Sequence, residues 1–219
     1  MDRRDGSGSF KRNPRHLHAW SVQQQIVDAY VLWALTESDV ASGNPQRSAT
    51  ELVSELDALN EAARKSEDPY LISLAAASMK NAQREQDAEK LFEKLAEKQK
   101  PTGELIGQTT VTQSGGISRT VETTALAMLA WSKHPKYSAK VSHPAKWLTK
   151  NRSGSGGFGS TQATVLAQGA GRLLQGRFQT FQRWRVVGQA QRQSDRPDNI
   201  ANSGQQRDDG RDRRFGIEL

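Results

Sequence analysis

The 219-residue chain has no cysteine, and this absence removes several kinds of chemistry at once. Disulfides, thiolate metal sites and cysteine nucleophiles are all excluded. No apolar run approaches the roughly 18 residues that a membrane span requires. The first residues, Met1–Gly6, carry two arginines and two aspartates and lack the apolar stretch of a secretion signal. As written, the sequence therefore predicts a soluble chain that stays where it is made.

Histidine is almost as scarce, with four in the whole chain and none in His-x-x-x-His spacing. His134 and His143 lie at the two ends of the stretch 136–142, and each is followed by a proline. With so few histidines and no cysteine to complete a ligand set, a zinc site is not expected there. We expect no metal site and no cofactor.

Two short motifs imitate ligand-binding sequences. Gly154–Gly157 precedes a predicted helix, whose N-terminus would attract an anion. It lacks the Lys-Ser/Thr ending of a phosphate-binding loop, so a flexible turn is the better interpretation. Asp208–Asp212 reproduces the Asp-Asp-x-x-Asp pattern of the metal-diphosphate sites of terpene synthases. Those sites need an apolar helix that directs the carboxylates into a cavity, whereas this motif lies in a polar, Arg-rich stretch and is interpreted as a chance match.

Charge and composition divide the chain after residue 167. The whole chain holds 31 Lys+Arg against 24 Asp+Glu, a net charge of +7. Residues 1–167 are rich in Lys, Glu, Ala and Leu, and they are long enough to form one domain with a core. Residues 168–219 contain ten arginines, no lysine and six acidic residues, with many Gln and Gly. Their low content of apolar residues predicts a disordered tail.

The periodicity of residues 1–167 predicts helices of two alternating kinds. Helices that are apolar around most of their circumference are predicted near 26–37, 70–82, 120–132 and 160–167. Charged, amphipathic helices are predicted between them, near 49–66, 85–99 and 139–150. A helix that is apolar all round must be covered on every side, whereas an amphipathic helix can line the outside.

Repetition every 40–50 residues or so is typical of stacked helical hairpins. We therefore predict an all-α fold in which an inner layer of apolar helices is wrapped by an outer layer, forming an incomplete α/α toroid. A right-handed helical solenoid would give a similar pattern and is the structural alternative.

Six short pieces of sequence, taken in order, carry a resemblance to a known family. They are Asp5-Gly6 with Phe10, Ala29–Leu35, Asp68–Tyr70, Glu97–Pro101, Val121–Ala127 and Gly157–Gln162. From about Arg3 to Ala167 the chain resembles the thioester domain of the alpha-2-macroglobulin and complement family. Each piece alone is weak, but six in the right order are specific. The resemblance implies a domain of a large secreted or periplasmic protein that traps proteases or, in complement, tags surfaces.

The reactive centre of that family is an internal thioester between the Cys and the Gln of a Cys-x-Glu-Gln motif. Proteolysis exposes the bond, and a nucleophile attacks it. The motif normally lies upstream of the region matched here, and this chain, which has no Cys, cannot form the bond. The resemblance thus implies a non-enzymatic fragment that lacks the start of the domain and is inactive alone. Its partners would be the remainder of the parent protein and, through the parent, proteases.

One reactive residue of the family, a histidine, has a possible counterpart in this chain. In complement-type members, a His in the loop after the Asp-Gly-x-Phe turn attacks the thioester and then transfers the acyl group to hydroxyls. His18, in the loop after Phe10, is nearest to the matching position. Imidazole suits this role because a pKa of ~6.5 leaves it mostly neutral and nucleophilic. Without a thioester, the simpler interpretation is that His16 and His18 are exposed loop residues beside Arg12 and Arg15.

A shift of the reading frame would explain the unusual composition of residues 168–219. In the family, the helix that contains Gly-Ser-Thr-Gln continues with residues such as Leu-Lys-Ala-Leu. Back-translation of Gln168–Gly171, read one nucleotide later, gives Lys or Arg, then Val, Ala, Glu or Gly, then Leu, Pro, Gln or Arg. This set includes Lys-Ala-Leu, so we expect the tail to be out-of-frame translation without an evolved function.

Two other classes of function stay open from the sequence. An α/α-toroid enzyme of the terpenoid cyclase or lyase type would need acidic residues on its inner helices, where Asp28 and Glu122 are the candidates. A helical-repeat module with an Arg-rich arm would bind nucleic acid through phosphate contacts, with strong salt sensitivity. We do not expect nucleic acid as a partner.

The resemblance also carries an expectation about stability. A toroid of this family has around twelve helices, and the roughly seven predicted here would leave the flanks of 26–37 and 120–132 exposed. Each fully exposed Leu or Trp forfeits about 1.5–3 kcal/mol of burial. We therefore expect the isolated chain to be marginally stable, to dimerise or aggregate, or to need an upstream fragment.

Overall fold

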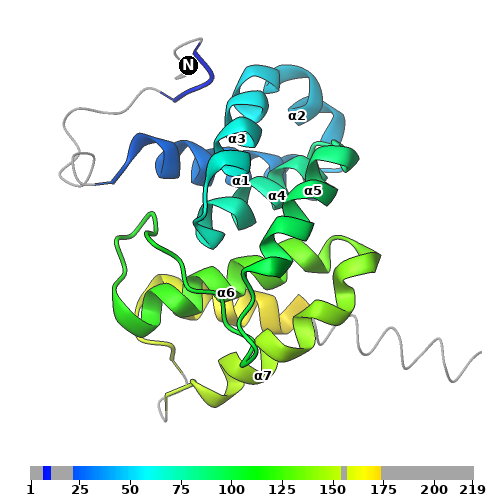
Figure 1. Cartoon of the computed structure of the whole chain (residues 1–219). Helices are drawn as coiled ribbons and strands as arrows, with labels where there is room; N and C mark the ends of the chain where they lie inside the picture. Colours follow the sequence, from blue (N-terminus) through cyan, green and yellow to red (C-terminus); the bar gives the residue numbers. More distant parts are fainter. Residues whose placement is uncertain (1–6, 11–21, 154–156, 174–219) are drawn as a thin grey trace, which may run out of the picture. The chain divides into compact units, whose positions relative to one another are not determined.

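The folded part of the chain consists of helices joined by short connections and one longer loop (Figure 1). The computed structural model describes residues 7–10, 22–153 and 157–173. The chain separates into the units Met1–Leu174 and Gln175–Leu219, and residues 174–219 lie outside the described residues. The predicted disordered tail starts too early at residue 168, because residues 168–173 continue the last helix. In order, the helices are α1 (Gln24–Ala41), α2 (Pro45–Glu51), α3 (Val53–Lys65), α4 (Pro69–Asn81), α5 (Glu85–Glu97), α6 (Gly116–Ser132), the 3₁₀-helix η1 (Pro135–Val141), α7 (Ser142–Lys150) and a last helix over residues 161–173. The predicted all-α class is confirmed.

Local sequence explains how α4 begins and how the chain turns after α5. Pro69 occupies the first helical position, where its missing N–H is not needed. Asp68 caps the helix, because its side chain accepts a hydrogen bond from the backbone N–H of Tyr70 at 3.0 Å. After α5, the N–H of Gly103 donates to the carbonyl of Lys100 at 2.8 Å, which closes the predicted turn. Gly103 has a φ of +110°, a conformation that favours glycine.

Two of the predicted helices are divided in the structure. The helix predicted at 49–66 is α2 followed by α3, because Leu52 leaves the helical region between them, with φ −115° and ψ 27°. The helix predicted at 139–150 begins as the 3₁₀-helix η1 and becomes α-helical at Ser142. Pro135 starts η1 with its fixed φ, and the side chain of His134 caps it by accepting from the N–H of Lys136 at 3.2 Å.

The inner and outer helices differ in burial as their sequences predict. Every residue of α4 except Lys80 is buried, and α4 packs against α1, α3, α5 and α6. In α6, Val121–Ser132 is buried except for the half-buried Leu129. By contrast, α3 and α5 bury one face each and present charged residues on the other. Large buried side chains, led by Trp131, Tyr70 and Phe92, fill the space between these layers.

The expectation that two apolar helices would have exposed flanks is half wrong. The helix over 120–132 is covered, because α4, η1 and α7 all pack against α6. The helix over 26–37 does have an exposed side, on which Leu35 keeps 40% of its surface accessible. Within the described residues, the predicted open arc therefore has an uncovered apolar face on α1.

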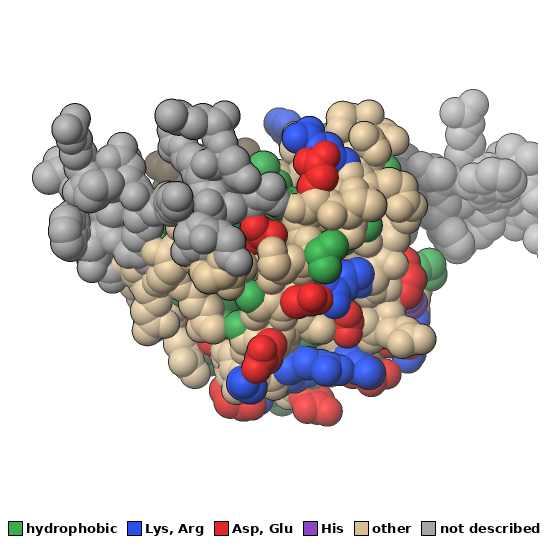
Figure 2. Space-filling model, turned by 90° about the horizontal axis from the view of Figure 1, so that it is seen from above, with side chains coloured by type: hydrophobic (Ala, Val, Ile, Leu, Met, Phe, Trp, Pro, Cys, Tyr) green, Lys and Arg blue, Asp and Glu red, His purple; other side chains and the backbone are tan. Residues whose placement is uncertain are grey.

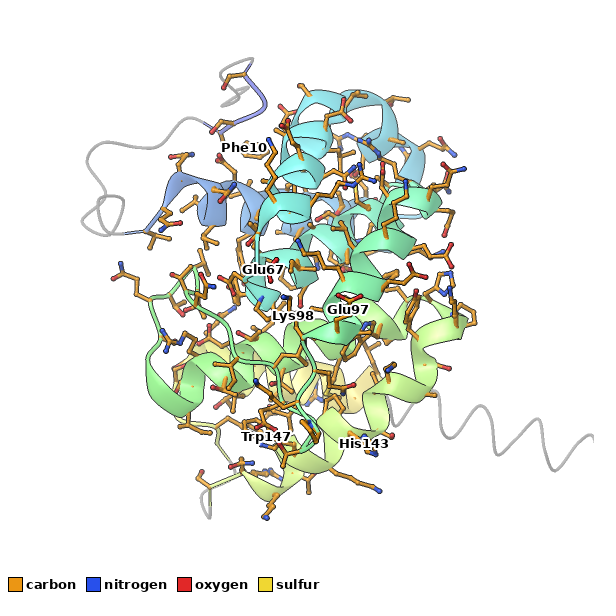
Figure 3. The ribbon with its side chains drawn as sticks, viewed as in Figure 1. Phe10, Glu67, Glu97, Lys98, His143 and Trp147 are labelled. Carbon is orange, nitrogen blue, oxygen red and sulfur yellow. The ribbon has the colours of Figure 1, made fainter. Side chains whose placement is uncertain are left out.

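Charged side chains tie the outer elements together. Arg84 pairs with Asp57 of α3 at 2.6 Å, and Lys136 of η1 pairs with Glu89 of α5 at 2.6 Å. Lys98, just after α5, pairs with Glu67, just after α3 (Figure 3). Figure 2 shows basic and acidic side chains interspersed on one face of the molecule rather than gathered by sign. Exposed ion pairs of this kind contribute about 0–1 kcal/mol each to stability, so they stabilise the contacts between the outer elements only weakly.

We predict that Gly107→Ala destabilises the fold by about 1–3 kcal/mol, because buried sites tolerate added methyl groups poorly. A Cβ at this position would lie 2.2 Å from Oγ1 of Thr123 and 3.3 Å from Cβ of Tyr70. Gly169→Ala is the matched control, since an added Cβ there meets nothing within 4 Å and the residue is helical. Alanine at Gly169 should raise stability by about 0.5–1 kcal/mol. Urea unfolding followed by circular dichroism measures the stability of both variants. Equal changes in stability would contradict the packing of the loop between α5 and α6, which carries Gly107, against Thr123 of α6.

Candidate functional site

Asp68 fastens the long loop between α5 and α6 to the start of α4. Its carboxylate caps α4 and also accepts hydrogen bonds from the backbone N–H groups of Gln108 and Thr109, at 2.9 and 3.3 Å. Asp68 is 5% exposed, so these three neutral donors replace most of the water it would otherwise bind. The carboxylate is therefore occupied by the backbone and is not available to a ligand.

Tyr70, one residue into α4, holds the next part of the same loop. Its hydroxyl accepts a hydrogen bond from the backbone N–H of Val111 at 3.3 Å. Burial raises the pKa of Tyr70 well above its ordinary value of 10.0, and the nearby acidic groups Glu122, Tyr30 and Asp68 raise it further. The side chain therefore stays a neutral phenol at any physiological pH.

Glu122 is buried and accepts hydrogen bonds from three hydroxyl groups, which come from two places in the chain. Its carboxylate accepts from Ser114 at 2.5 Å, from Ser160 at 2.9 Å and from Thr112 at 3.2 Å. The residue has no exposed surface. A carboxylate in such a position is tolerated only when hydrogen bonds compensate it, and here hydroxyls supply them. Glu122 thus joins α6 to the loop before it and to the turn that starts the last helix.

The Gly157–Gln162 piece starts the last helix and connects it to α1. Ser160 caps the helix, because its Oγ accepts from the N–H of Ala163 at 3.0 Å. Gly159 has a φ of +90°, and a Cβ there would lie 2.3 Å from Oγ of Ser118. Nε2 of Gln162 donates to the hydroxyl of Tyr30 at 2.7 Å. This bond joins two of the six pieces across 132 residues of sequence.

Residues of three of the pieces therefore lie along the loop between α5 and α6. We call Asp68, Tyr70, Ser114, Glu122 and Ser160 the polar cluster. Each of its members bonds to another part of the chain, so the cluster is a set of satisfied internal contacts.

The segment before α1 is held by a second carboxylate. Asp28 accepts from the hydroxyl of Ser9 at 2.5 Å and from the N–H of Phe10 at 3.1 Å, while Nε2 of Gln24 donates to it at 2.7 Å. A cavity of about 210 Å³ lies beside these residues, lined also by Glu55 and by apolar side chains of α1 and α3. Asp5, Gly6 and the predicted acyl-transfer residue His18 lie outside the described residues.

The other residues that the sequence suggests for binding have structural roles here. His134 caps η1 and packs beside Phe92 and Tyr137, whereas His143 is exposed on α7 near Trp147, far from Phe10 (Figure 3). The N–H of Gly157 donates to Oγ of Ser153 at 3.0 Å, so it does not point into an anion site. Residues 154–156 and Asp208–Asp212 lie outside the described part. Within that part, no group of three or more His, Cys, Asp or Glu converges on a common point.

Sequence reasoning missed the hydroxyl donors of the polar cluster. Ser114 and Thr112 belong to a loop without regular periodicity, and nothing local ties them to Glu122. The sequence nevertheless contained evidence that Glu122 needs buried hydrogen-bond donors. Glu122 is the one acidic residue in an otherwise small and apolar helix, and such a residue is rarely buried without partners. The abundance of Ser and Thr around residues 109–124 supplied those partners.

Comparison with known proteins agrees with the six pieces. The family model described as the A-macroglobulin TED domain matches residues 2–170, which is most of the chain. The resemblance from Arg3 to Ala167 is thereby confirmed. No curated protein matches the chain. Among the described helices, none has the length and apolar content needed to cross a bilayer.

We predict that Glu122→Gln lowers the free energy of unfolding by about 1–3 kcal/mol, because the buried hydroxyls lose a charged acceptor. Ser114 and Ser160 both donate to Oε1, so the amide oxygen of glutamine can replace it, but its NH₂ group would then face Thr112, whose hydroxyl loses its acceptor. Glu97→Gln is the control, since Glu97 is exposed at the end of α5 (Figure 3) and should change stability by less than about 0.5 kcal/mol. Denaturant titration measures both variants. Equal midpoints would contradict a stabilising role of the Glu122 carboxylate.

Proposed function

Since the chain belongs to the family of A-macroglobulin TED domains, we propose that it is part of a macroglobulin-like protein that traps proteases, and that it lacks the reactive thioester. The observation that carries the proposal is the polar cluster. Ser160 bonds to Glu122 and Gln162 bonds to Tyr30, so residues of three of the six pieces bond to one another inside the fold, as expected of a domain scaffold. The reactive bond would belong to a Cys-x-Glu-Gln motif elsewhere in the parent, because this chain has no Cys.

The chain itself is proposed to be non-enzymatic. The two acidic residues that a toroid enzyme would use on its inner helices are both engaged, Asp28 with the Ser9–Phe10 segment and Glu122 with the hydroxyls around it. Glu122 has no surface to offer a substrate. The cyclase or lyase alternative is therefore less well supported than the scaffold. The parent protein is proposed to act outside the cytoplasm, where proteases of other cells are met.

A role for His18 stays a proposal of the same kind. It would act only in the parent, by attacking a thioester that another segment provides and transferring the acyl group to a hydroxyl. The segment that carries His18 follows Phe10, whose backbone is held by Asp28 on α1.

We predict that the purified chain takes up no methylamine and leaves a protease free to cleave large substrates. A polypeptide that joins residues 1–170 to the upstream segment of the parent should take up methylamine at the Gln of Cys-x-Glu-Gln, and should shield a trapped protease from a protein inhibitor. Incorporation of labelled methylamine and cleavage of small against large substrates measure the two effects. A Cys→Ala change in the upstream motif is the control. A joined polypeptide that binds no amine and traps no protease would overturn the proposal.

The stretch after residue 167 is proposed to be out-of-frame translation. The family match ends at residue 170, close to the predicted boundary. The last helix runs to residue 173, and Ala163, Leu166, Ala167 and Ala170 form its buried stripe. Read one nucleotide later, the codon at position 170 can specify Leu, which would continue that stripe.

We predict that the gene, read one nucleotide later from codon 168, encodes Lys or Arg, then Val, Ala, Glu or Gly, then Leu, followed by further helical sequence. DNA sequencing of an independent isolate measures this directly. An alternate frame that meets a stop codon within a few residues, or that lacks helical periodicity, would refute it. Salt-sensitive binding of RNA by residues 168–219 would instead favour an Arg-rich nucleic-acid arm.

A further inference from the structure

Charge is divided unevenly along the folded part of the chain. Residues 22–122 hold ten Lys and Arg against 16 Asp and Glu, a net charge of −6. Residues 123–153 hold six Lys and Arg and no acidic residue, a net charge of +6. All six basic residues lie on η1, on α7 or within two residues of them. A segment that carries one sign of charge indicates a partner of the opposite sign.

The rest of the fold neutralises two of these lysines and leaves three without a partner. Lys133 and Lys136 pair with Glu37 of α1 and Glu89 of α5, at 2.9 and 2.6 Å. The other three lysines are exposed, and they form no ion pair with any described residue. These three are Lys140, Lys146 and Lys150. The helix α7 lies at the opposite end of the folded part from α2 (Figure 1), away from the face of mixed charge seen in Figure 2.

The spacing of the free lysines places them on one side of α7 and η1. Lys146 and Lys150 are four residues apart, so they share a helix face and lie about 6 Å apart along the axis. His143, three residues before Lys146, is on the same face and is exposed (Figure 3). Lys140 lies three residues earlier, in the last turn of η1, where side chains at this spacing project to the same side. We call Lys140, His143, Lys146 and Lys150 the basic face.

Packing fixes the backbone that carries the basic face. A Cβ at Gly103 would lie 2.5 Å from the carbonyl carbon of His143, so the turn after α5 touches the start of α7. Nε2 of Gln99, beside the same turn, donates to the carbonyl of Lys140 at 3.3 Å. A charged row on a fixed helix loses less conformational freedom when it binds a partner.

We propose that the basic face binds a linear anionic polysaccharide, sulfated or carboxylated, through its lysines. Lysine presents a compact charge on a flexible stem, so it can follow repeated anionic groups without a fixed geometry. A densely charged polymer also releases counterions when lysines neutralise it, which makes the affinity depend on salt. The choice of a polysaccharide rests on the proposed function, in which the parent protein acts outside the cytoplasm.

The composition of the basic face disfavours other anionic partners. None of the exposed large hydrophobic residues of the described structure lies between 133 and 153, so the face has nothing to insert into a bilayer. Protein interfaces are centred on aromatic residues and Arg and are depleted of Lys. Single-stranded nucleic acids stack on exposed aromatic side chains, whereas Trp147 of α7 is half-buried. Duplex DNA and a second copy of the chain, with its acidic residues 22–122, are distinguished by experiment.

Lysine-specific acetylation tests the basic face without interference from the C-terminal stretch, because residues 168–219 contain ten arginines and no lysine. The 219-residue chain is labelled with an N-hydroxysuccinimide ester at about 0.15 M salt, alone, with heparin or with neutral dextran. Peptide mass spectrometry reads the rate at each lysine. Lys65 and Lys90 are the matched controls, since both are exposed and belong to the outer helices α3 and α5.

Heparin should slow the labelling of the three free lysines at least about threefold, and this protection should vanish near 1 M salt. Lys65 and Lys90 should be unaffected, and neutral dextran should protect no lysine. Equal slowing at the control lysines overturns the proposal. Stronger protection by duplex DNA or by anionic vesicles, at the same concentration of charge, overturns it in favour of that partner. Protection that grows with the concentration of the chain alone overturns it in favour of a second copy.

Charge reversal gives an independent measurement. The variant Lys140→Glu/Lys146→Glu/Lys150→Glu should elute from a heparin column at lower salt than Arg64→Glu/Lys65→Glu/Lys90→Glu, which has the same net charge. Circular dichroism checks that both variants are folded, and equal elution of two folded variants overturns the proposal. The methylamine assay is separate. Uptake of methylamine by the joined polypeptide without protection by heparin counts against the basic face only, and protection without uptake counts against the proposed function only.

Discussion

Buried carboxylates that are satisfied by neutral donors hold this fold together. Asp68 and Glu122 lie where water cannot compensate them, so the loop between α5 and α6 must supply backbone N–H and hydroxyl groups at fixed positions. That requirement determines where the loop runs, and the loop in turn covers the side of α6 that carries Thr123 and Thr124. The apolar burial of α4 and α6 is larger in area, but it is not directional. The hydrogen bonds of the two carboxylates select one arrangement among many that would bury the same helices.

The difference in burial between apolar and amphipathic helices follows from which of their faces can be exposed to water. α4 and α6 have no polar face to present to water, and the surrounding helices cover them. The outer helices need cover on one side only, so charged residues occupy the other side and form pairs of modest value.

Part of the sequence that carries the family resemblance has a structural role. Asp68, Glu122 and Ser160, which belong to the six pieces, make internal contacts. The chain matches the A-macroglobulin TED domain although it has no Cys. Tyr30 and Gln162, which bond across the fold, and Ser160, which caps the last helix, keep its start in place.

The sequence by itself determined the class of the fold, the family and most helices. Periodicity and helix breakers are local properties, so α4, α5 and α6 lie close to the ranges predicted for them, and Asp68-Pro69 marked the start of α4 correctly. The break at Leu52 and the 3₁₀ turn before Ser142 were missed, because each is a small deviation in backbone angles that side-chain patterns do not encode. Only the tertiary structure showed which residues surround Glu122. Ser114 and Ser160 are separated from each other by 46 residues, and hydrogen bonds across such a distance depend on how the helices pack. Packing among the described residues also decided that α6 is covered and that α1 is not, since coverage is a property of neighbours and not of a helix alone.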